Sequence, residues 1–379
     1  MKKVLILAAE NSAETYGVEV VRALRRRIPG IRLFGVGGER FRKMGVELIH
    51  HNREYAVVGV FEILSQLARF HRRMRRLVRE AVSRKADAAL LIDYPDFNLR
   101  LARRLKKAGI PVYYYIAPTV WAWRPGRVRQ LRRHTHHLFI IFPFEQEIFR
   151  RARVAHTYTG HPLLSMVSVL HSRERFRRRF GVAPDTRMIT LLPGSRGSEV
   201  ERLLPAMRSA VEKLAADHDL AVFLLQADHI DDDQLQSLLH GCPVRIRVLP
   251  QEERFDLINA SDLALTTCGT SNLEIALLGV PFVAGYRVSP LTYRLRFLLR
   301  INRYSIVNIL AGDDVVPELI QQDFTADNLA REARKIIDDP EWGQNMRRRL
   351  AAVTRTLSRD GDPSDMIAAR MASDLCSGD

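Results

Sequence analysis

The sequence predicts an α/β protein in which two parallel sheets follow one another along the chain, each covered by helices on both faces. Short apolar runs, typical of strands buried on both sides, alternate with amphipathic stretches of helical spacing. This alternation restarts near residue 188, and a length of 379 residues fits two or three domains. We therefore expect two doubly wound α/β domains that bind ligands at the carboxyl ends of their strands.

The first half of the chain contains five predicted strands and three predicted helices. The strands are Val4–Ala9, Ile31–Val36, Ala88–Asp93, Val112–Ile116 and Leu138–Phe142. The helices are Thr15–Arg27, Phe61–Arg84 and Leu99–Ala108. The first run follows two lysines, as in a signal peptide, but its six residues are too few and Glu10 ends it. We expect a buried strand there, and no run reaches the roughly 20 apolar residues of a membrane span.

The second half repeats the pattern with five more predicted strands. They are Met188–Leu192, Ala221–Leu225, Val244–Leu249, Leu263–Thr266 and Pro281–Ala284. Further helices are expected over Arg173–Phe180, over residues 325–355 and over Ser358–Asp379. We place the first domain at residues 1–165 and the second at residues 166–357.

The net charge of +16, with an isoelectric point near 10.2, favours an anionic partner. Nucleic acid, an anionic membrane and a phosphorylated substrate all fit this charge. The arginines are dispersed over many predicted helices and no nucleic-acid-binding motif is present, so we expect no nucleic-acid partner. Three cysteines are too few for a disulfide framework or a zinc site and fit a reducing cytoplasm.

Two loops of the second half have the composition of anion-binding turns between a strand and a helix. In the first, Gly194 allows close backbone approach, the amides from Ser195 onward would face an anion, and Arg196 adds a charge-assisted contact. In the second, Thr270 or Ser271 would cap a helix and face a phosphate, and Glu274 would accept from a ribose diol. The alternatives are a tight turn with a solvated arginine and an ordinary capped helix. Together the two loops suggest a nucleotide diphosphate, although neither is a Walker A motif.

The loops of the first half suggest a base and an apolar wall. Asp93 ends a buried strand, where a partly desolvated carboxylate could take a proton from a hydroxyl. Trp121 and Trp123 follow the next strand and could border a sugar or an acyl chain. The alternatives are a helix cap for Asp93 or Asp96 and ordinary core packing for the tryptophans. His161, taken alone, is more often a structural residue.

One segment favours a membrane surface. Phe61, Leu64 and Leu67 are apolar, and Arg72 and Arg73 follow them closely, as on a helix that lies on an anionic bilayer. The alternative is a core helix with a solvated basic end. The run of three aspartates from Asp231 is expected to be a solvated helix start rather than a metal site, because no other ligand cluster accompanies it.

Taken together, these loops resemble those of the lipid-A-disaccharide synthase family, over nearly the whole chain from Glu10 to about Gln321. Several motifs in one order make the resemblance specific. They are Ile92–Asn98, Val120–Arg124, Phe142–Glu145, Gly160–Pro162, Leu192–Gly197, Gly269–Glu274, Gly285–Arg287, Asn308–Gly312 and Pro317–Gln321.

The resemblance implies a GT-B fold, two Rossmann-like domains with a cleft, that needs no metal and no cofactor. It implies an inverting transfer from UDP-2,3-diacylglucosamine to 2,3-diacylglucosamine 1-phosphate (lipid X), giving a β-1,6-linked disaccharide 1-phosphate and UDP. It also implies a cytoplasmic enzyme, peripheral on the cytoplasmic face of the inner membrane, whose final helix returns to the first domain. The composition leaves a monomer and a homodimer equally open.

The resemblance also assigns roles to residues. Asp93 becomes the base, and Gly194, Ser195, Arg196, Thr270 and Ser271 hold the diphosphate. On the donor side Glu274 holds the ribose, with Asn308 and Gln321 near the nucleotide or sugar. The acceptor side is expected to include Glu10, Ser12, Trp121, Trp123 and His161.

The first loop, Ala9–Glu14, departs from the family pattern Gly-Glu-x-Ser-Gly-Asp at both glycines and at the aspartate. Two added methyl groups restrict close backbone approach, so the acceptor pocket is expected to differ. This departure keeps a second enzyme open, a GT-B protein that acts on a UDP-amino sugar with another acceptor, or an epimerase. A basic protein that binds anionic surfaces or nucleic acid is the alternative from another class.

Overall fold

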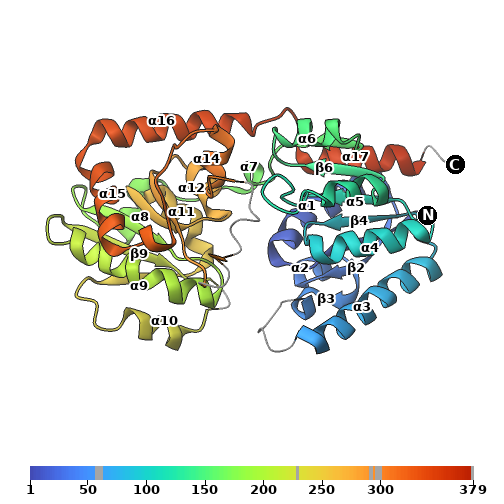
Figure 1. The fold of residues 1–379 in the computed structure, drawn as a ribbon, viewed down its shortest axis with the longest axis horizontal. Helices are drawn as coiled ribbons and strands as arrows, with labels where there is room; N and C mark the ends of the chain where they lie inside the picture. Colours follow the sequence, from blue (N-terminus) through green and yellow to red (C-terminus); the bar gives the residue numbers. More distant parts are fainter. Residues whose placement is uncertain (56–62, 228–229, 290–292, 295–300, 377–379) are drawn as a thin grey trace. The chain divides into compact units, whose positions relative to one another are not determined.

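The computed structural model describes residues 1–55, 63–227, 230–289, 293–294 and 301–376, with only the backbone described over residues 63–67. The chain divides into two compact units (Figure 1). Unit 1 consists of Met1–Pro162 together with Leu357–Asp379, and unit 2 consists of Leu163–Thr356. The last part of the chain therefore belongs with the first.

Unit 1 is built on a sheet of seven parallel strands in the order β3-β2-β1-β4-β5-β6-β7. The strands are β1 (Lys3–Ala8), β2 (Arg32–Gly37), β3 (Glu47–His51), β4 (Ala88–Ile92), β5 (Val112–Tyr115), β6 (His137–Ile140) and β7 (His156–Tyr158). The five predicted strands are present, whereas β3 and β7 were not expected. Both lie at edges of the sheet, where half-exposed strands carry polar residues and give no continuous apolar run.

Helices cover both faces of this sheet. On one face lie α1 (Asn11–Arg27), α2 (Glu39–Lys43) and α17 (Pro363–Cys376); on the other lie α3 (Ile63–Ser83), α4 (Pro95–Lys107) and α5 (Arg127–His134). Two short helices, η1 (Asn52–Tyr55) and α6 (Glu145–Arg151), complete the unit. Successive side chains of a strand point to opposite faces of the sheet. In β5, Tyr113 and Tyr115 therefore enter the core on one face, and Tyr114 enters the core on the other.

The end of the chain is anchored in unit 1 by α17. Its residues Ile367, Ala368, Met371 and Leu375 are buried in the core that α1 also covers. Polar contacts add to this packing, because Tyr113 donates to Asp374 at 2.8 Å and Arg26 pairs with Asp365 at 2.8 Å. The helix expected within Ser358–Asp379 is present; it begins at Pro363, after the Asp-Gly-Asp turn that introduces it, and is described as far as Cys376.

Unit 2 has a second parallel sheet, of six strands in the order β10-β9-β8-β11-β12-β13. The strands are β8 (Arg187–Leu192), β9 (Leu220–Leu225), β10 (Ile246–Leu249), β11 (Leu263–Thr267), β12 (Phe282–Tyr286) and β13 (Glu318–Ile320). The five predicted strands are present, although β10 begins two residues later than expected. Strand β13 has only three residues at an edge, so its apolar signal is weak.

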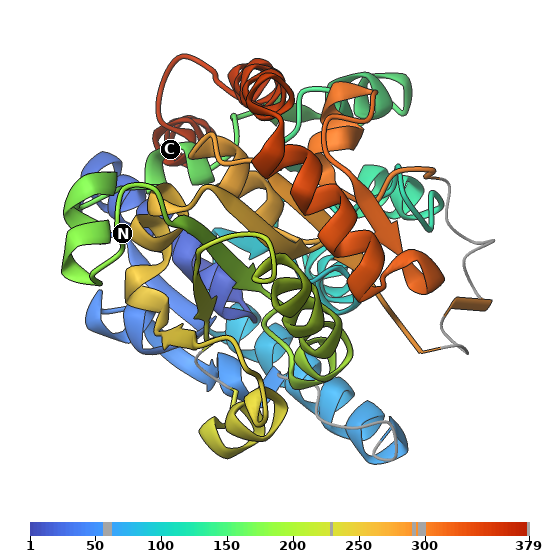
Figure 2. The same cartoon turned by 90° about the vertical axis from the view of Figure 1, so that its left-hand side faces the viewer.

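The helices of unit 2 form layers on both sides of its sheet, with α9 and α15 side by side (Figure 2). The elements are α7 (Leu163–Met166), α8 (Arg173–Arg179), α9 (Gly197–Leu214), α10 (Asp232–Leu239), η2 (Gln251–Glu253), α11 (Arg254–Ala260), α12 (Ser271–Leu277), α14 (Ile306–Ala311), η4 (Gln321–Asp323), α15 (Ala326–Asp338) and α16 (Pro340–Thr356). The helical region expected over 325–355 is two helices. Pro340 disfavours a helical conformation at Asp339, which has φ −111° and ψ 98°.

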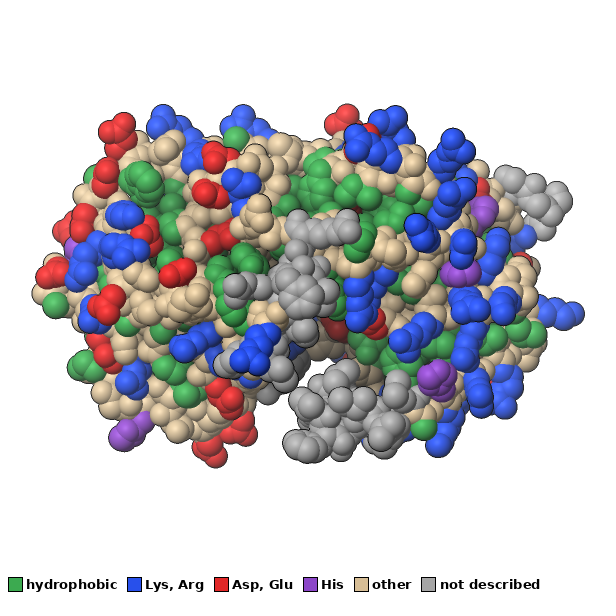
Figure 3. Space-filling model, viewed as in Figure 1, with side chains coloured by type: hydrophobic (Ala, Val, Ile, Leu, Met, Phe, Trp, Pro, Cys, Tyr) green, Lys and Arg blue, Asp and Glu red, His purple; other side chains and the backbone are tan. Residues whose placement is uncertain are grey.

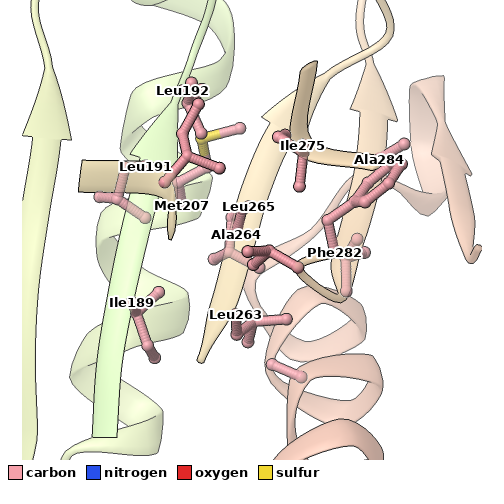
Figure 4. Close-up of a cluster of buried hydrophobic side chains, with 14 of the residues drawn as sticks. Ile189, Leu191, Leu192, Met207, Leu263, Ala264, Leu265, Ile275, Phe282 and Ala284 are labelled. Atoms are coloured by element: carbon pink, nitrogen blue, oxygen red, sulfur yellow. The ribbon is translucent and has the colours of Figure 1, made fainter. Parts of the chain in front are cut away.

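The core of unit 2 is a set of aliphatic side chains between strands and helices. Leu191, Leu265 and Phe282 project from three neighbouring strands, and Met207 of α9 and Ile275 of α12 pack against them (Figure 4). These side chains are 0% exposed. Polar side chains along such a sheet need a partner, as Thr190 of β8 has in Ser261, so most of the polar chemistry lies at the strand ends.

The charge of the chain is divided unequally between the two units. Unit 1 holds 34 lysines and arginines against 18 aspartates and glutamates, whereas unit 2 holds 25 of each. The whole excess of +16 therefore lies in unit 1. Figure 3 shows lysine and arginine side chains gathered where α3, α4 and α5 lie. Among the described helices, none combines the length and the apolar character that a membrane crossing requires.

Candidate functional site

The turn after β4 carries the predicted base. Asp93 and Tyr94 both adopt left-handed backbone angles, with φ of 48° and 47°. Each such residue costs about 1–3 kcal/mol, so the surroundings must hold the turn in place. The Asp93 carbonyl accepts from the Asn98 side chain at 2.6 Å and from the Tyr114 hydroxyl at 2.8 Å, and its N–H donates to Tyr115 at 2.8 Å. These hydrogen bonds therefore hold the turn at the end of β4 in its left-handed conformation.

The environment of the Asp93 side chain favours the protonated form. Burial and, to a smaller extent, the nearby charge of Glu10 together raise its pKa from 3.8 to about 6, while the Tyr94 N–H opposes the shift. Glu10 is exposed and precedes α1 at the end of the neighbouring strand β1. The topology thus brings together two carboxylates that are 83 positions apart in the sequence. A carboxylate with this pKa can accept a proton near neutral pH.

The departing residue of the first loop does not face the candidate base. Glu14 is 4% exposed, and its Oε1 accepts from the N–H groups of Gly38 at 2.7 Å and Phe41 at 2.9 Å. It therefore caps the first turn of α2. The expectation that the added methyl groups of Ala9 and Ala13 change the acceptor pocket stays a prediction. Ser12 is exposed in the first turn of α1.

Trp121 lies in a cluster of aromatic side chains. Its ring meets Phe144 edge to face at 5.3 Å, Phe144 stacks on Phe142 at 5.7 Å, and Phe142 lies 5.3 Å from the ring of His161. His161 is 4% exposed, and burial lowers its pKa to about 3, so its ring is neutral. The cluster joins three of the predicted loops of unit 1.

A buried acid, which the sequence did not single out, adjoins this cluster. Glu145 is 1% exposed and accepts from the Phe142 N–H at 3.2 Å. Burial raises the pKa of its carboxyl to about 8, although the Phe142 amide and the nearby Trp121 indole favour the charged form. The indole lies close to this carboxylate without completing a hydrogen bond of normal geometry. The sequence contains the Phe-Pro-Phe-Glu motif, but it does not indicate that the glutamate of the motif is buried.

Trp123 supports two arginines. The guanidinium of Arg124 lies 4.1 Å from the centre of its ring and that of Arg127 lies 5.5 Å away. Both arginines pair with Asp96, Arg124 at 3.0 Å. Trp123 is therefore a platform for cations rather than a bare apolar wall, and Asp96 binds two guanidiniums.

The first donor loop of unit 2 already holds an anion, the carboxylate of Glu199. The N–H groups of Ser195 and Arg196 point to its Oε2, at 3.2 and 3.4 Å, and the Arg196 side chain reaches Oε1 at 3.2 Å. Gly194 has φ +120°, and a Cβ there would lie 2.5 Å from the same carboxylate. These contacts form the capping box at the start of α9, so the anion-binding role of the loop stays a prediction.

The second donor loop uses its polar side chains internally. The Ser271 hydroxyl lies 3.0 Å from that of Thr266, and the Asn272 side chain donates to Thr267 at 2.7 Å. Thr270 is exposed and its side chain makes no capping bond, so of the two predicted contacts it is the one that faces outward. Ser271 shapes the loop.

Glu274 forms an ion pair that the sequence did not reveal. It is 5% exposed, and its partner is Arg254 at the start of α11. Burial raises the pKa of Glu274, whereas the charge of Arg254 and its hydrogen bond lower it. Twenty positions separate these two residues, and no local pattern links them.

Asn308 and Gln321 brace the backbone. Asn308 is 1% exposed; its amide donates to Val316 and Glu318, both at 2.8 Å, and accepts from the N–H groups of Val315 and Val316. Gln321 exchanges two hydrogen bonds with the backbone of Val288, at 2.6 and 3.2 Å. Both residues therefore position the segments that follow β12 rather than present free amide groups.

The predicted membrane residues are described only in part. Phe61 lies outside the described residues, as do the side chains of Leu64 and Leu67, although both belong to α3. Arg72 is exposed on this helix. Arg73 instead pairs with Glu54 at 3.5 Å and lies 5.3 Å from the centre of the Tyr55 ring, so it ties α3 to η1.

Acidic residues serve as caps where a metal was considered. Asp231 precedes α10 and accepts from the N–H groups of Asp233 at 2.9 Å and Gln234 at 3.3 Å. Within the described part of the chain, no group of three histidine, cysteine or acidic side chains is arranged to hold a metal ion.

Comparison with known proteins identifies the family. The family model described as Lipid-A-disaccharide synthetase matches residues 4–362. The chain belongs to this family. It is 38% identical to the lipid-A-disaccharide synthase of Koribacter versatilis over 379 residues, covering 100% of this chain and 98% of the relative. It is 40% identical to that of Myxococcus xanthus over 336 residues, covering 88% of each. The expected family and enzyme class, a glycosyltransferase of lipid A biosynthesis, are confirmed.

Solved structures confirm the GT-B fold class at low sequence identity. A putative UDP-N-acetylglucosamine 2-epimerase from Listeria monocytogenes has a TM-score of 0.66 at 15% identity, covering 100% of this chain and 98% of that one. A UGT transferase from Siraitia grosvenorii, solved with UDP, has a TM-score of 0.64 at 13% identity, covering 99% and 100%. Likeness at this level concerns the fold alone. The assignment to the synthetase family, among the proteins that share this fold, therefore rests on the sequence comparison.

The buried acid leads to a test of stability. Because folding raises the pKa of Glu145 from 4.5 to about 8, the free energy of unfolding should fall as pH rises between these values, by at most about 1.4 kcal/mol per pH unit. Glu145→Gln removes this dependence. Urea unfolding at several pH values should show the variant gaining on the wild type from pH 5 to pH 8. Glu147→Gln, on the exposed side of the same helix, should show no such gain; equal slopes for all three proteins would contradict the assignment.

Proposed function

We propose that this synthetase transfers a 2,3-diacylglucosaminyl group from UDP to the 6-hydroxyl of 2,3-diacylglucosamine 1-phosphate, with inversion. The family membership supports the reaction, and one observation supports the mechanism. Asp93 ends a parallel strand on a braced, strained turn, and its pKa is raised to about 6. A carboxylate of this kind is suited to accept the proton of an attacking hydroxyl.

The proposed reaction needs a single base. Asp93 takes the proton of the acceptor 6-hydroxyl while its oxygen attacks the anomeric carbon from the face opposite UDP. The C–O bond to the diphosphate breaks in the same displacement, and the electron pair leaves with UDP. One displacement inverts the configuration, so no nucleophilic carboxylate is required. The negative charge of Glu10 raises the pKa of Asp93, so the Asp93 carboxylate is a stronger base toward the hydroxyl proton.

The donor loops of unit 2 are proposed to receive the diphosphate. The amides of Ser195 and Arg196 hold the Glu199 carboxylate, so they can hold a phosphate oxygen when that side chain moves aside. Arg196 is 72% exposed and free to turn toward the charge that develops on the leaving group. Thr270 adds an outward hydroxyl. Glu274, oriented by Arg254, is the proposed ribose acceptor.

We place the enzyme at the cytoplasmic face of the inner membrane, as a peripheral protein. The excess charge of unit 1 supports this location, because each lysine or arginine near an anionic surface contributes about 1 kcal/mol. Helix α3 contains the apolar positions Leu64 and Leu67 together with exposed Arg72. Docking by unit 1 would leave the acyl chains in lipid while the sugars react.

The reaction is tested by supplying both proposed substrates to the purified protein in mild detergent. Mass spectrometry should detect the disaccharide 1-phosphate, and a coupled assay should detect UDP in equal amount. UDP release without disaccharide would mean that another acceptor, or water, takes the sugar. Absence of both turnover and UDP binding would reject the donor site.

The base is tested by substitution and pH. Asp93→Asn should lower turnover by roughly 10²–10⁴-fold and leave UDP binding intact. In the wild type kcat/KM should fall as pH drops below about 6, because protonated Asp93 cannot accept a proton. Glu10→Gln should move this fall to lower pH, since it removes a charge that raises the pKa of Asp93. Near-normal turnover of the Asp93 variant would remove this residue from the role.

The membrane surface is tested by liposome flotation. Changing Phe61, Leu64 and Leu67 together to serine should release the protein from anionic vesicles and leave the reaction in detergent unchanged. Leu170→Ser, at an exposed leucine of unit 2, is the matched control and should bind like the wild type. Added salt should weaken binding of the wild type because the charge attraction is screened. Unchanged flotation of the triple variant would exclude α3 as the anchor.

A further inference from the structure

A cavity of about 340 Å³ lies between α4 and α5 of unit 1. Pro95, one of its lining residues, follows the candidate base Asp93 by two positions in the sequence. Its wall is formed by the first turns of α4 and by the segment that leads into α5. The lining residues are Pro95, Asp96, Leu99, Arg100, Arg124, Gly126, Arg127 and Gln130. Pro95 and Asp96 are the first two residues of α4, directly after the Asp93–Tyr94 turn, so the cavity and the base lie at the same edge of the sheet.

The lining of this cavity carries an excess of positive charge. Arg100, Arg124 and Arg127 face a single acidic residue, Asp96, which leaves two positive charges in excess. This excess complements the two negative charges of a phosphate monoester. Guanidinium groups also match the geometry of phosphate oxygens, with two parallel N–H donors.

The two arginines of the α5 segment are held in position before any ligand arrives. Asp96 pairs with both, and the ring of Trp123 supports both guanidiniums, at 4.1 and 5.5 Å. The Arg127 side chain is 7% exposed, whereas that of Arg124 is 53% exposed. Arg127 is thus a fixed part of the wall, and Arg124 keeps donors available. Donors that are already oriented lose little entropy on binding.

The cavity is linked electrostatically to the base through Tyr114. The hydroxyl of this buried tyrosine donates to the Asp93 carbonyl at 2.8 Å. The same side chain lies within range of the charges of Asp93, Arg127 and Asp96, although burial is the main reason that its pKa is raised. Tyr114 is therefore near both the candidate base and the cationic wall.

We propose that this cavity binds the phosphate monoester on the anomeric carbon of the acceptor. The proposal rests on the proposed function, since it assigns the place of one substrate group. The anomeric carbon and the carbon that bears the 6-hydroxymethyl group both adjoin the ring oxygen, so the phosphate and the 6-hydroxyl flank the same edge of the glucosamine ring. Fixing the phosphate between α4 and α5 then directs the hydroxyl toward Asp93. The enzyme would distinguish acceptor from donor by this free monoester, which the UDP-linked sugar lacks.

The test compares two acceptors, 2,3-diacylglucosamine 1-phosphate and its dephosphorylated form, in detergent. The wild type should prefer the phosphorylated acceptor in kcat/KM. Arg124→Ala should lower kcat/KM for that acceptor by about tenfold to hundredfold, the usual effect of losing a charge-assisted hydrogen bond, and leave the dephosphorylated one unchanged. Arg124→Lys should recover part of the loss. Arg103→Ala, an exposed arginine of α4 in the neighbouring groove, should behave like the wild type.

The outcomes separate this proposal from its alternatives. Equal losses of Arg124→Ala on both acceptors, or a wild type that does not distinguish them, would overturn the assignment. Loss of flotation on phosphatidylglycerol vesicles by Arg124→Ala, with unchanged acceptor preference in detergent, would overturn it in favour of a lipid headgroup. A wild type that uses neither acceptor but still binds UDP would instead remove the proposed reaction, a result distinct from failure of the cavity.

Discussion

The burial of both parallel sheets on both faces is the constraint on which the rest of the structure depends. Strands such as β4 and β8 are almost wholly inaccessible to solvent, so they carry aliphatic residues along their length. Polar groups enter the fold where these strands end, and the chain must turn sharply there to begin a helix. At Asp93 and Tyr94 the turn takes two consecutive left-handed residues, whose cost is offset by the Asn98 and Tyr114 hydrogen bonds. The same geometry that permits a dry core thus creates the position for a reactive carboxylate.

Most polar residues at these strand ends hold the loops rather than face outward. Glu14 caps α2, Asn308 satisfies four backbone and side-chain contacts, and Gln321 binds the Val288 backbone. A buried polar group without a partner costs about 1–3 kcal/mol, so these contacts are close to obligatory. Many residues of a sequence motif can therefore shape a loop without facing a ligand. Arg196 and Thr270 are both exposed, as the ligand contacts that we propose for them require.

The sequence predicted the fold class and the loops because continuous apolar runs and glycine-rich turns are local signals. Edge strands such as β3 and β13 escaped, since half-exposed pairing needs no apolar run. The ion pair between Glu274 and Arg254 and the burial of Glu145 also escaped, because both depend on contacts between distant segments. Asp93 was predicted as the end of a strand, yet the shift in its pKa arises from burial and from Glu10, which only the topology brings near. The sequence was therefore enough to predict which side chain stands at the strand end, but not the electrostatic environment of that side chain.

The docking of α17 on α1 makes unit 1 discontinuous in the chain. During synthesis the ribosome completes the seven strands of its sheet long before the helix that covers part of one face. Residues 163–356 are translated in between and can form unit 2 as a continuous segment. Until α17 has been translated, the apolar surface that receives Ile367, Met371 and Leu375 is open to solvent and to other chains. The nascent protein thus carries a temporary aggregation hazard, and unit 1 can complete its core only after the residues of unit 2 have been synthesised.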